Sequence, residues 1–439
     1  MSKLIEQPRY SCALGVQQSV VAINRAVPIV HAGPGCSTKI HSLLGQGEGY
    51  AGGSTIPCTN SSESEIVFGG ERKLRGVIEG ALKVIDADLY VVLTGCTSDI
   101  VGDDVGQVTR DFQDLGNPIV YAETGGFKSN NYVSHDLIIK AIVEQFVDRY
   151  APAKDEKIPG LVNVFATIPY QDPYWIGNLQ ELKRLLEGIG LKANVLFGPE
   201  SGGAPEWLTI PQAEFNIVVS AWPGLKSAEL LQRKYDTPFY HFPYLPVGGI
   251  ETSRFLRGVA DFSSVNREQA EAFILSEEKK FYAHIERTAD FMLEFRYGLP
   301  RIFYTILDAT YAVGFAKYLL NELGIIPAEQ YIVDNTPEEY RESIREQFRT
   351  ISDRRSAQVE FTEDGGGIQE DIRKNQLKQR SLILGSGWER DLANEIGADL
   401  LPVSVPVTYR LILNCGYAGY NGGLRLVEDI YDRVLGTYR

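Results

Sequence analysis

The 439-residue chain is 44% apolar and 23% charged, as folded globular proteins are, and at roughly 150 residues per domain its length predicts about three domains. Its 43 lysines and arginines stand against 57 aspartates and glutamates, which gives a net charge of −14. This charge argues against nucleic acid or an anionic membrane surface as a partner, because both bind concentrated positive charge.

In the first third of the chain, short apolar runs alternate with longer amphipathic runs, a pattern typical of parallel α/β folds. A helix is expected over residues 13–24. Strands are expected at residues 27–30, 89–93 and 118–121. The polar, proline-containing stretch 151–157 predicts a domain boundary.

Two further blocks repeat this pattern. The second block predicts a strand, a helix and a strand at residues 161–165, 178–186 and 193–197. The third block predicts the same order at residues 301–306, 311–323 and 331–333. A long helix at residues 268–296 is expected to connect the two blocks, and the glycines at 365–367 are expected to form a flexible loop.

We therefore predict three doubly wound, Rossmann-like parallel-sheet domains. The predicted bounds are 1–155 for an N-terminal domain that carries three cysteines, 156–285 for the second domain and 286–439 for the third. In such sheets, ligands bind beyond the carboxyl ends of the strands.

The chain has five cysteines, an odd number too small for a secreted scaffold held by disulfides. The N-terminus has no apolar segment of signal-peptide length, and no run approaches the ~18 apolar residues of a membrane span. These observations predict a cytoplasmic protein with reduced thiols. Each thiol is then either a core side chain or a metal ligand.

Three cysteines are candidate ligands because of their positions. Cys96 follows a buried strand, Cys36 lies in a glycine-framed turn after another strand, and Cys12 precedes a predicted helix. Their spacings of 24 and 60 residues exclude ferredoxin-type and zinc-finger motifs. Three thiolates fall short of the usual four of a self-contained iron–sulfur site, so the alternatives are a cluster shared across a subunit interface and three structural thiols. We expect Cys58 and Cys415 to be structural.

Other polar residues near the predicted sheet edge have weaker signals. His31 precedes the Cys36 turn and is either a residue that supports a metal ligand or a hydrogen-bonded turn histidine. The pair Asp103 and Asp104 is expected to cap a helix or to orient the Cys96 turn. The sequence contains no P-loop, no nucleophile elbow and no zinc-protease motif.

Six motifs, taken together, resemble the β (K-type) subunit of the nitrogenase component 1 family in order and spacing. They are residues Cys12–Gly15, Gly33–Cys36, Ile66–Gly70, Thr94–Asp104, Glu123–Lys128 and Gly419–Leu426. The resemblance implies that Cys12, Cys36 and Cys96 hold half of an 8Fe-7S P-cluster, and that a homologous α (D-type) subunit of an α2β2 heterotetramer holds the other half. It also implies that an ATP-hydrolysing iron protein (H-type reductase) supplies low-potential electrons.

The same resemblance indicates which subunit this is. Catalytic α subunits of the family hold an active-site metallocluster with a mid-chain cysteine and a late histidine. This chain has no cysteine between Cys96 and Cys415 and no histidine after His284, so no active-site metallocluster is expected on it. Residues 244–252 and 405–410 resemble the β type.

Two differences from molybdenum nitrogenase β subunits indicate which substrate to expect. Molybdenum nitrogenase β subunits often carry a serine that ligates the oxidised cluster, and the matching position here is Gly126. The chain also lacks the long N-terminal extension of that group. Both features resemble alternative nitrogenases or nitrogenase-like reductases such as methylthio-alkane reductase, so we expect an electron-relay subunit for the reduction of methylthio-alkanes or N2. The alternatives are a cofactor-assembly scaffold of the same fold and a small-molecule-binding protein with structural thiols.

Overall fold

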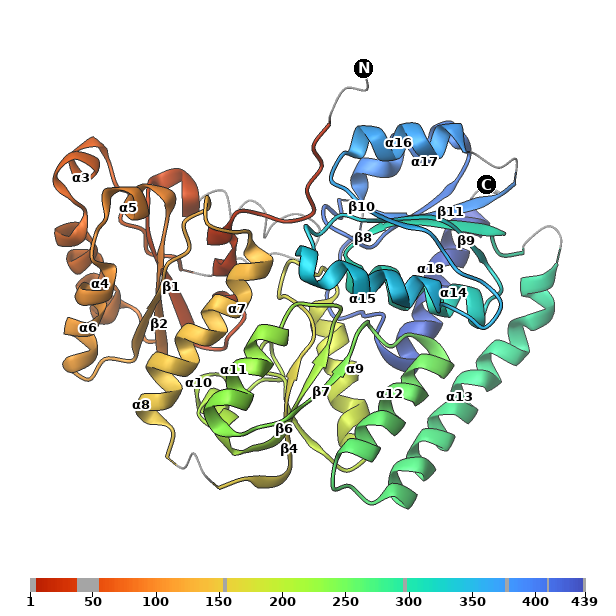
Figure 1. Cartoon of the computed structure of the whole chain (residues 1–439), viewed down its shortest axis with the longest axis horizontal. Coiled ribbons are helices and arrows are strands. Elements are labelled where there is room, and N and C mark those ends of the chain that lie inside the picture. Colours follow the sequence, from red (N-terminus) through yellow and green to blue (C-terminus); the bar gives the residue numbers. More distant parts are fainter. Residues whose placement is uncertain are drawn as a thin grey trace.

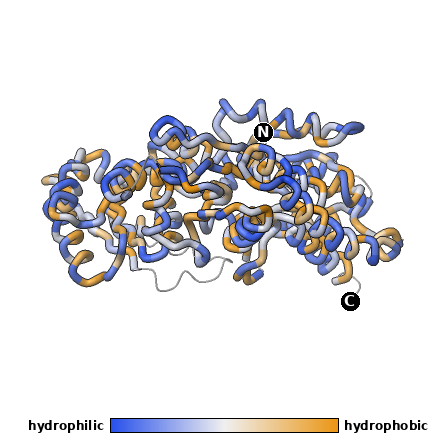
Figure 2. The backbone as a smooth tube through the Cα atoms, turned by 90° about the horizontal axis from the view of Figure 1, so that it is seen from below, coloured by the Kyte–Doolittle hydropathy of each residue, from blue (hydrophilic) through white to orange (hydrophobic). Residues whose placement is uncertain are grey.

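The computed structural model describes residues 5–37, 55–152, 156–294, 298–375, 379–408 and 410–436. Within them the chain forms three wholly parallel sheets, each flanked by helices (Figure 1). The predicted fold class is therefore confirmed. Figure 2 shows hydrophobic and hydrophilic residues alternating along the outer helices, as expected of helices that cover a sheet with one face. None of the described helices is long and apolar enough to cross a membrane.

The first sheet has the order β1-β2-β3. Its strands are β1 (Ala26–His31), β2 (Leu89–Thr94) and β3 (Ile119–Ala122). The helices of this part are η1 (Ala13–Val16), α1 (Gln17–Val21), α3 (Glu63–Phe68), α4 (Glu71–Val84), α5 (Cys96–Val101), α6 (Val105–Asp114), α7 (Asn131–Ile142), η2 (Val143–Val147) and α8 (Asp148–Tyr150).

Strand β2 shows why this sheet is covered on both faces. All six of its residues are buried. Leu89, Val91 and Leu93 belong to a core shared with α1 and α7, whereas Tyr90 and Val92 belong to a core shared with α4 and α6. Because alternate side chains of a strand point to opposite faces, a continuous apolar run requires a helical layer on each side.

The second sheet has the order β5-β4-β6-β7. Its strands are β4 (Ile158–Phe165), β5 (Lys192–Asn194), β6 (Ala213–Val219) and β7 (Phe239–Phe242). Its helices are α9 (Trp175–Gly188), α10 (Ala204–Trp207), η3 (Ile210–Gln212), α11 (Leu225–Tyr235) and α12 (Gly248–Phe262).

The third sheet has the order β10-β9-β8-β11-β12. Its strands are β8 (Ile302–Leu307), β9 (Ile326–Ile332), β10 (Val359–Phe361), β11 (Ser381–Gly385) and β12 (Asp399–Pro402). The accompanying helices are α14 (Ala309–Asn321), α15 (Glu338–Arg349), α16 (Gly365–Lys374), η4 (Gly387–Glu389) and α17 (Arg390–Ile396).

Two helices join the second and third sheets. The long helix α13 (Arg267–Leu293) runs along one side of the molecule, as the sequence predicted (Figure 1). The C-terminal helix α18 (Gly419–Gly436) packs against α9, α12, α13 and β12. The predicted boundary between residues 285 and 286 falls within α13, and the division into three domains at these residues remains a prediction.

Three local expectations were wrong. The predicted helix 13–24 is a 3₁₀ turn, η1, continued by α1, which ends at Val21; Gly15 in η1 lies so close to Ser11 that a Cβ would clash with its hydroxyl. The predicted strand 193–197 ends at Asn194, since Leu196 has a φ of 64° and cannot continue a strand. The expected glycine loop is instead the first turn of α16, because Asp364 accepts a hydrogen bond from Gly367 N at 3.0 Å and so caps the helix.

Buried carboxylates lie between the second and third sheets. Asp308 caps α14 by accepting a hydrogen bond from Tyr311 N at 3.1 Å. Asp334 follows β9 and accepts hydrogen bonds from Trp222 Nε1 at 3.1 Å and Ala309 N at 3.0 Å. Burial and the nearby charge of Asp334 raise the pKa of Asp308 to about 8.

This raised pKa predicts how stability depends on pH. An unfolded aspartate titrates near ~4, so between about pH 4 and pH 8 the folded state holds a proton that the unfolded state has lost. The free energy of unfolding therefore falls as pH rises through this interval. Asp308→Asn keeps the helix cap and removes the free-energy cost of burying a charged carboxylate. The substitution should therefore raise the free energy of unfolding by ~1 kcal/mol or more near pH 8 and by less near pH 5.

Thermal unfolding at both pH values measures the difference. Asp104→Asn is the matched control, because Asp104 caps the exposed start of α6. An equal effect of Asp308→Asn at the two pH values would contradict the raised pKa of Asp308.

Candidate functional site

The carboxyl edge of the first sheet gathers the loops that follow its three strands. His31 at the end of β1 is in register with Thr94 at the end of β2, so the segments that carry Cys36 and Cys96 both leave the sheet at this edge. Gly95 N donates to the His31 carbonyl at 3.0 Å. Thr124, after β3, donates through its backbone N–H to Thr94 Oγ1 at 2.9 Å. These bonds hold the loops together at one edge.

Cys12 reaches the same place from the N-terminal segment. Its neighbour Ser11 pairs with Asn131 at the start of α7, through Ser11 N to Asn131 Oδ1 at 2.9 Å and Asn131 N to the Ser11 carbonyl at 3.1 Å. A β-bridge also pairs Cys12 with Asn130. The loop that leads into α7 therefore fixes the position of Cys12.

Gly126 is the point on which Cys12 and Cys96 converge. A Cβ atom added to Gly126 would lie 3.2 Å from Cys96 Sγ and 3.7 Å from Cys12 Sγ. The Gly126 N–H donates to Cys96 Sγ at 3.1 Å. Both cysteines are free and exposed. The structure thus brings together two of the three predicted ligands, with a glycine where a side chain would crowd the sulfurs.

Cys36 is half-buried and lies in helical residues 34–37 shortly after β1, not in the turn that the sequence predicted. In the described parts of the chain, no three His, Cys, Asp or Glu side chains form a group able to hold a metal ion, so Cys36 does not join the other two thiols in such a group. Cys58 forms a β-bridge with Val30, and its Sγ lies 3.6 Å from the Ala32 carbonyl oxygen. Cys415 is distant in sequence and has its Sγ 3.8 Å from an Arg410 nitrogen.

Both ring nitrogens of His31 have hydrogen-bond partners. Its Nδ1 is 3.2 Å from Thr59 Oγ1 and its Nε2 is 2.9 Å from Asp103 Oδ2. Burial lowers the pKa of His31, which favours the neutral ring. Asp103 also accepts a hydrogen bond from Gly70 N at 2.8 Å. His31 and Asp103 therefore join the start of α4 to the end of β1, whereas Asp104 caps α6 as predicted.

Exposed apolar side chains, which we call the apolar rim, lie near this edge. Its members lie on α3, on the adjacent α5 and next to Gly126 (Figure 1). They are Ile66, Val67, Phe68, Ile100 and Phe127. Phe68 is 87% exposed, and no residue of α3 is buried. This surface was not predicted from the sequence, where its only signal is the apolar run at 66–68 in a helix too short to cover a core.

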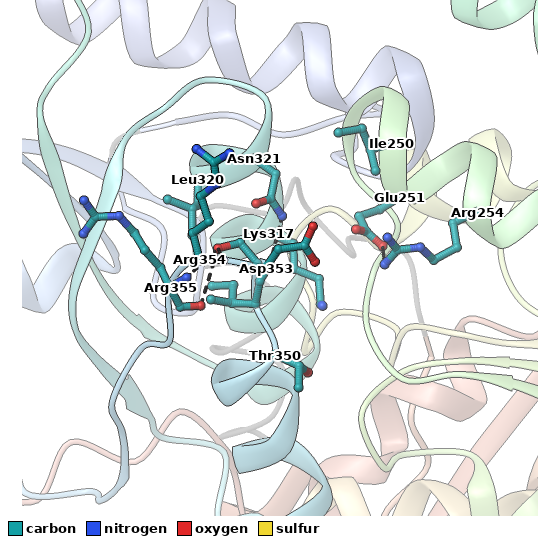
Figure 3. Close-up of a pocket in the computed structure, with 12 residues that line it drawn as sticks. Ile250, Glu251, Arg254, Lys317, Leu320, Asn321, Thr350, Asp353, Arg354 and Arg355 are labelled. Atoms are coloured by element: carbon teal, nitrogen blue, oxygen red, sulfur yellow. Dashed lines mark hydrogen bonds and ion pairs between the residues drawn. The ribbon is translucent and has the colours of Figure 1, made fainter.

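A cavity of about 600 Å³ lies elsewhere, between α12, α14 and residues 350–355. Figure 3 shows Glu251 and Arg254 together on one side of it and Arg354 and Arg355 on the other. Lys317 lines the same cavity, and burial lowers its pKa. The cavity contains no cysteine. The thiol site is therefore a surface feature, separate from this cavity.

The fold and the site define a large α/β protein of three parallel sheets with a surface thiol site at the carboxyl edge of the first. A family model described as "Nitrogenase component 1 type Oxidoreductase" matches residues 11–435. The chain belongs to this family of oxidoreductases.

Individual relatives agree with this membership and with the β type. The chain is 26% identical to the nitrogenase molybdenum-iron protein beta chain of Methanococcus maripaludis, over 97% of this chain and 93% of that protein. It is 25% identical to a subunit of the light-independent protochlorophyllide reductase of a Picosynechococcus strain, over 79% of this chain and 66% of that protein. A solved structure titled "Nitrogenase Cp1 at pH 6.5" matches all of this chain and 96% of its own, with a TM-score of 0.79 at 17% identity, which is a likeness of fold.

Proposed function

We propose that this chain is the electron-relay β subunit of a nitrogenase-like component 1 reductase, and that Cys12, Cys36 and Cys96 hold its half of an 8Fe-7S P-cluster. The observation that carries the proposal is the convergence of two exposed thiols, Cys12 and Cys96, around Gly126. Cys36 lies in the helical residues 34–37 that follow β1 at the same sheet edge.

The donor set suits this cofactor. Thiolates are the usual ligands of iron–sulfur clusters, which supply low-potential electron transfer when bound. The N–H of Gly126 already donates to Cys96 Sγ, and such hydrogen bonds to sulfur tune the potential of a cluster. Three thiols on this chain leave the remaining ligands to a partner. A site on the surface, rather than in a cavity, is what a shared cluster requires.

The partner we propose is a homologous α subunit in an α2β2 heterotetramer, with a separate ATP-hydrolysing iron protein as electron donor. The apolar rim supports an interface at this edge, because large exposed apolar side chains on neighbouring elements mark sites of protein association. No active-site metallocluster is assigned to this chain, so the substrate is reduced on the α subunit.

The substrate we propose is the C–S bond of a methylthio-alkane or N2. The two kinds of relative differ in their named reactions, one being a nitrogenase and the other a protochlorophyllide reductase, so family membership alone does not fix the substrate. A glycine at position 126, where molybdenum nitrogenase β subunits often carry a serine, favours a nitrogenase-like reductase.

The proposal is tested by co-purifying the chain with its partner without oxygen. We expect bound iron, an EPR signal after dye oxidation, and formation of methanethiol or ammonia with the iron protein and ATP. A preparation without iron would refute the cluster assignment. Iron without either product would refute the proposed reaction and favour an assembly scaffold.

Gly126 gives a further prediction. Gly126→Ser places a hydroxyl beside Cys96 Sγ, where it can ligate an oxidised cluster iron. This ligation should lower the midpoint potential of the oxidised couple by roughly 60 mV, a tenfold change in the equilibrium constant of a one-electron step. Redox titration followed by EPR measures the shift. Gly126→Ala adds the same Cβ without the oxygen, so an equal shift in both variants would show that crowding, not ligation, is the cause.

A further inference from the structure

The cavity of about 600 Å³ is lined by charged side chains from three parts of the chain. Helix α12 contributes Glu251 and Arg254, which lie one turn apart. Helix α14 contributes Lys317, and the segment 350–355, which follows α15, contributes one aspartate and two arginines. Figure 3 shows Lys317 between these two groups. The volume lies within the range of small-molecule sites.

Lys317 is the unusual residue of this lining. It is the only charged residue of α14, a helix in which every residue from Ala309 to Leu319 is buried. Lys317 itself is 4% exposed. Lysine is almost never buried to this extent unless its charge is paired, because an ammonium loses its hydration when it leaves water. A helix of this kind therefore carries a lysine at a cost in stability.

The ammonium of Lys317 has donors to spare. It forms no hydrogen bond or ion pair with the residues that the structure describes, and it lies 5.0 Å from the ring centre of Tyr244. The neighbouring carboxylate of Glu251 instead accepts hydrogen bonds from the Tyr244 hydroxyl at 2.6 Å and from Arg254 at 3.0 Å. Because Lys317 lines the cavity and its Nζ keeps accessible surface, an occupant of the cavity can accept from it.

The segment 350–355 adds three more charges to the cavity. Asp353, Arg354 and Arg355 are exposed, and within the described ranges their side chains form no ion pair. Two arginines against one aspartate leave an excess of positive charge on this side. The carboxylate of Asp353 is in turn an acceptor for hydroxyl groups.

We propose that this cavity binds a phosphate monoester of a small polyhydroxylated molecule, of the size of a sugar phosphate. Lys317 donates to the phosphate, and Arg354 and Arg355 add positive charge around it. Asp353 accepts hydrogen bonds from the hydroxyl groups. The negative charge of Glu251 is balanced by Arg254. The cavity is larger than a phosphate ion alone needs, which leaves room for the polyhydroxylated part.

The proposed site does not depend on the proposed cluster. The cavity contains no cysteine, so binding is measurable whether or not iron is present. A failure of the cluster assignment would leave this proposal standing, and the converse also holds.

The experiment titrates the full-length protein, as it is purified, by calorimetry and phosphorus NMR. The probes are three phosphate monoesters (of glucose, ribose and glycerol), inorganic phosphate, glucose and citrate. We expect at least one monoester to bind, inorganic phosphate to bind about tenfold more weakly for want of the hydroxyl contacts, and glucose not to bind. Citrate should bind more weakly than that monoester.

Two variants test the assigned roles. Lys317→Met keeps the length of the side chain and removes its charge, so it should weaken binding of the monoester at least about tenfold. Asp353→Ala should weaken binding of the monoester and leave binding of inorganic phosphate unchanged. Lys140→Met, on the exposed face of α7, is the matched control and should change neither. The melting temperature of each variant without ligand separates lost binding from lost folding.

Four results would overturn the proposal. They are no binding of any monoester, equal binding of inorganic phosphate, tighter binding of citrate, and binding of the monoester that Lys317→Met leaves unchanged in a folded protein. The first would mean that Lys317 merely reaches water through the cavity.

Discussion

Cys96→Ala is expected to abolish the proposed cluster and with it the reduction of substrate by the proposed complex. Cys96 is the first residue of α5, and its Sγ is held by the N–H of Gly126 beside Cys12. Removing a residue that merely supports a metal ligand costs on the order of 10–100-fold, so the loss of a ligand itself should reduce activity by at least ~100-fold. Bound iron should fall in the same variant.

Anoxic purification with iron analysis, EPR and product assays checks this expectation. Cys36→Ala should behave in the same way if Cys36 is the third ligand. Cys415→Ala is the control thiol, since it lies near Arg410 and outside the first sheet, and should keep full iron. Full iron content and full activity in Cys96→Ala would refute a cluster at the carboxyl edge of the first sheet.

Local sequence was sufficient to predict the strands of the first sheet, whereas β6, β7, β10, β11 and β12 were not predicted. The run Leu89–Leu93 is apolar at every position, which only a strand covered on both faces can bury. Cys96 follows such a strand directly, so its location at the carboxyl edge needed no long-range information. The prediction of a loop at glycines 365–367 was wrong. Glycine has a poor helix propensity, but the carboxylate of Asp364 caps the helix and stabilises its first turn.

Contacts between distant parts of the chain were not predictable from the sequence. Local patterns do not show that Cys12 and Cys96 meet at Gly126, because the meeting depends on how the N-terminal segment attaches to α7; only the family resemblance implied that these cysteines lie together. Nor did the sequence reveal the partnership of Arg9 and Glu389, which are 380 residues apart. The arrangement that would bring Cys36 to the other two thiols stays a prediction.

Glu389→Ala is expected to be the most destabilising single change outside the thiol site. Glu389 and Arg9 form an ion pair whose side chains are 2% and 1% exposed. Glu389 also accepts hydrogen bonds from the backbone N–H and the hydroxyl of Ser386. Removing one member of a buried pair leaves an uncompensated charge and costs ~3–5 kcal/mol. Denaturant unfolding should show this loss, whereas Glu428→Ala, in an exposed pair with Arg425, should cost under ~1 kcal/mol.

The same variant tests whether this ion pair positions Cys12, which we propose as a cluster ligand. Arg9 lies three residues before Cys12, and its carbonyl also accepts a hydrogen bond from Gln171. If the pair holds this segment in place, Glu389→Ala should speed the alkylation of Cys12 in the iron-free complex and leave Cys96 unchanged, since Cys96 is anchored separately by the first sheet. The double variant Arg9→Met/Glu389→Met removes both charges and should recover most of the stability. Faster alkylation of Cys12 in this stabilised double variant would show that the ion pair itself orders the thiol, whereas an equal increase at Cys96 would show only a general loosening of the fold.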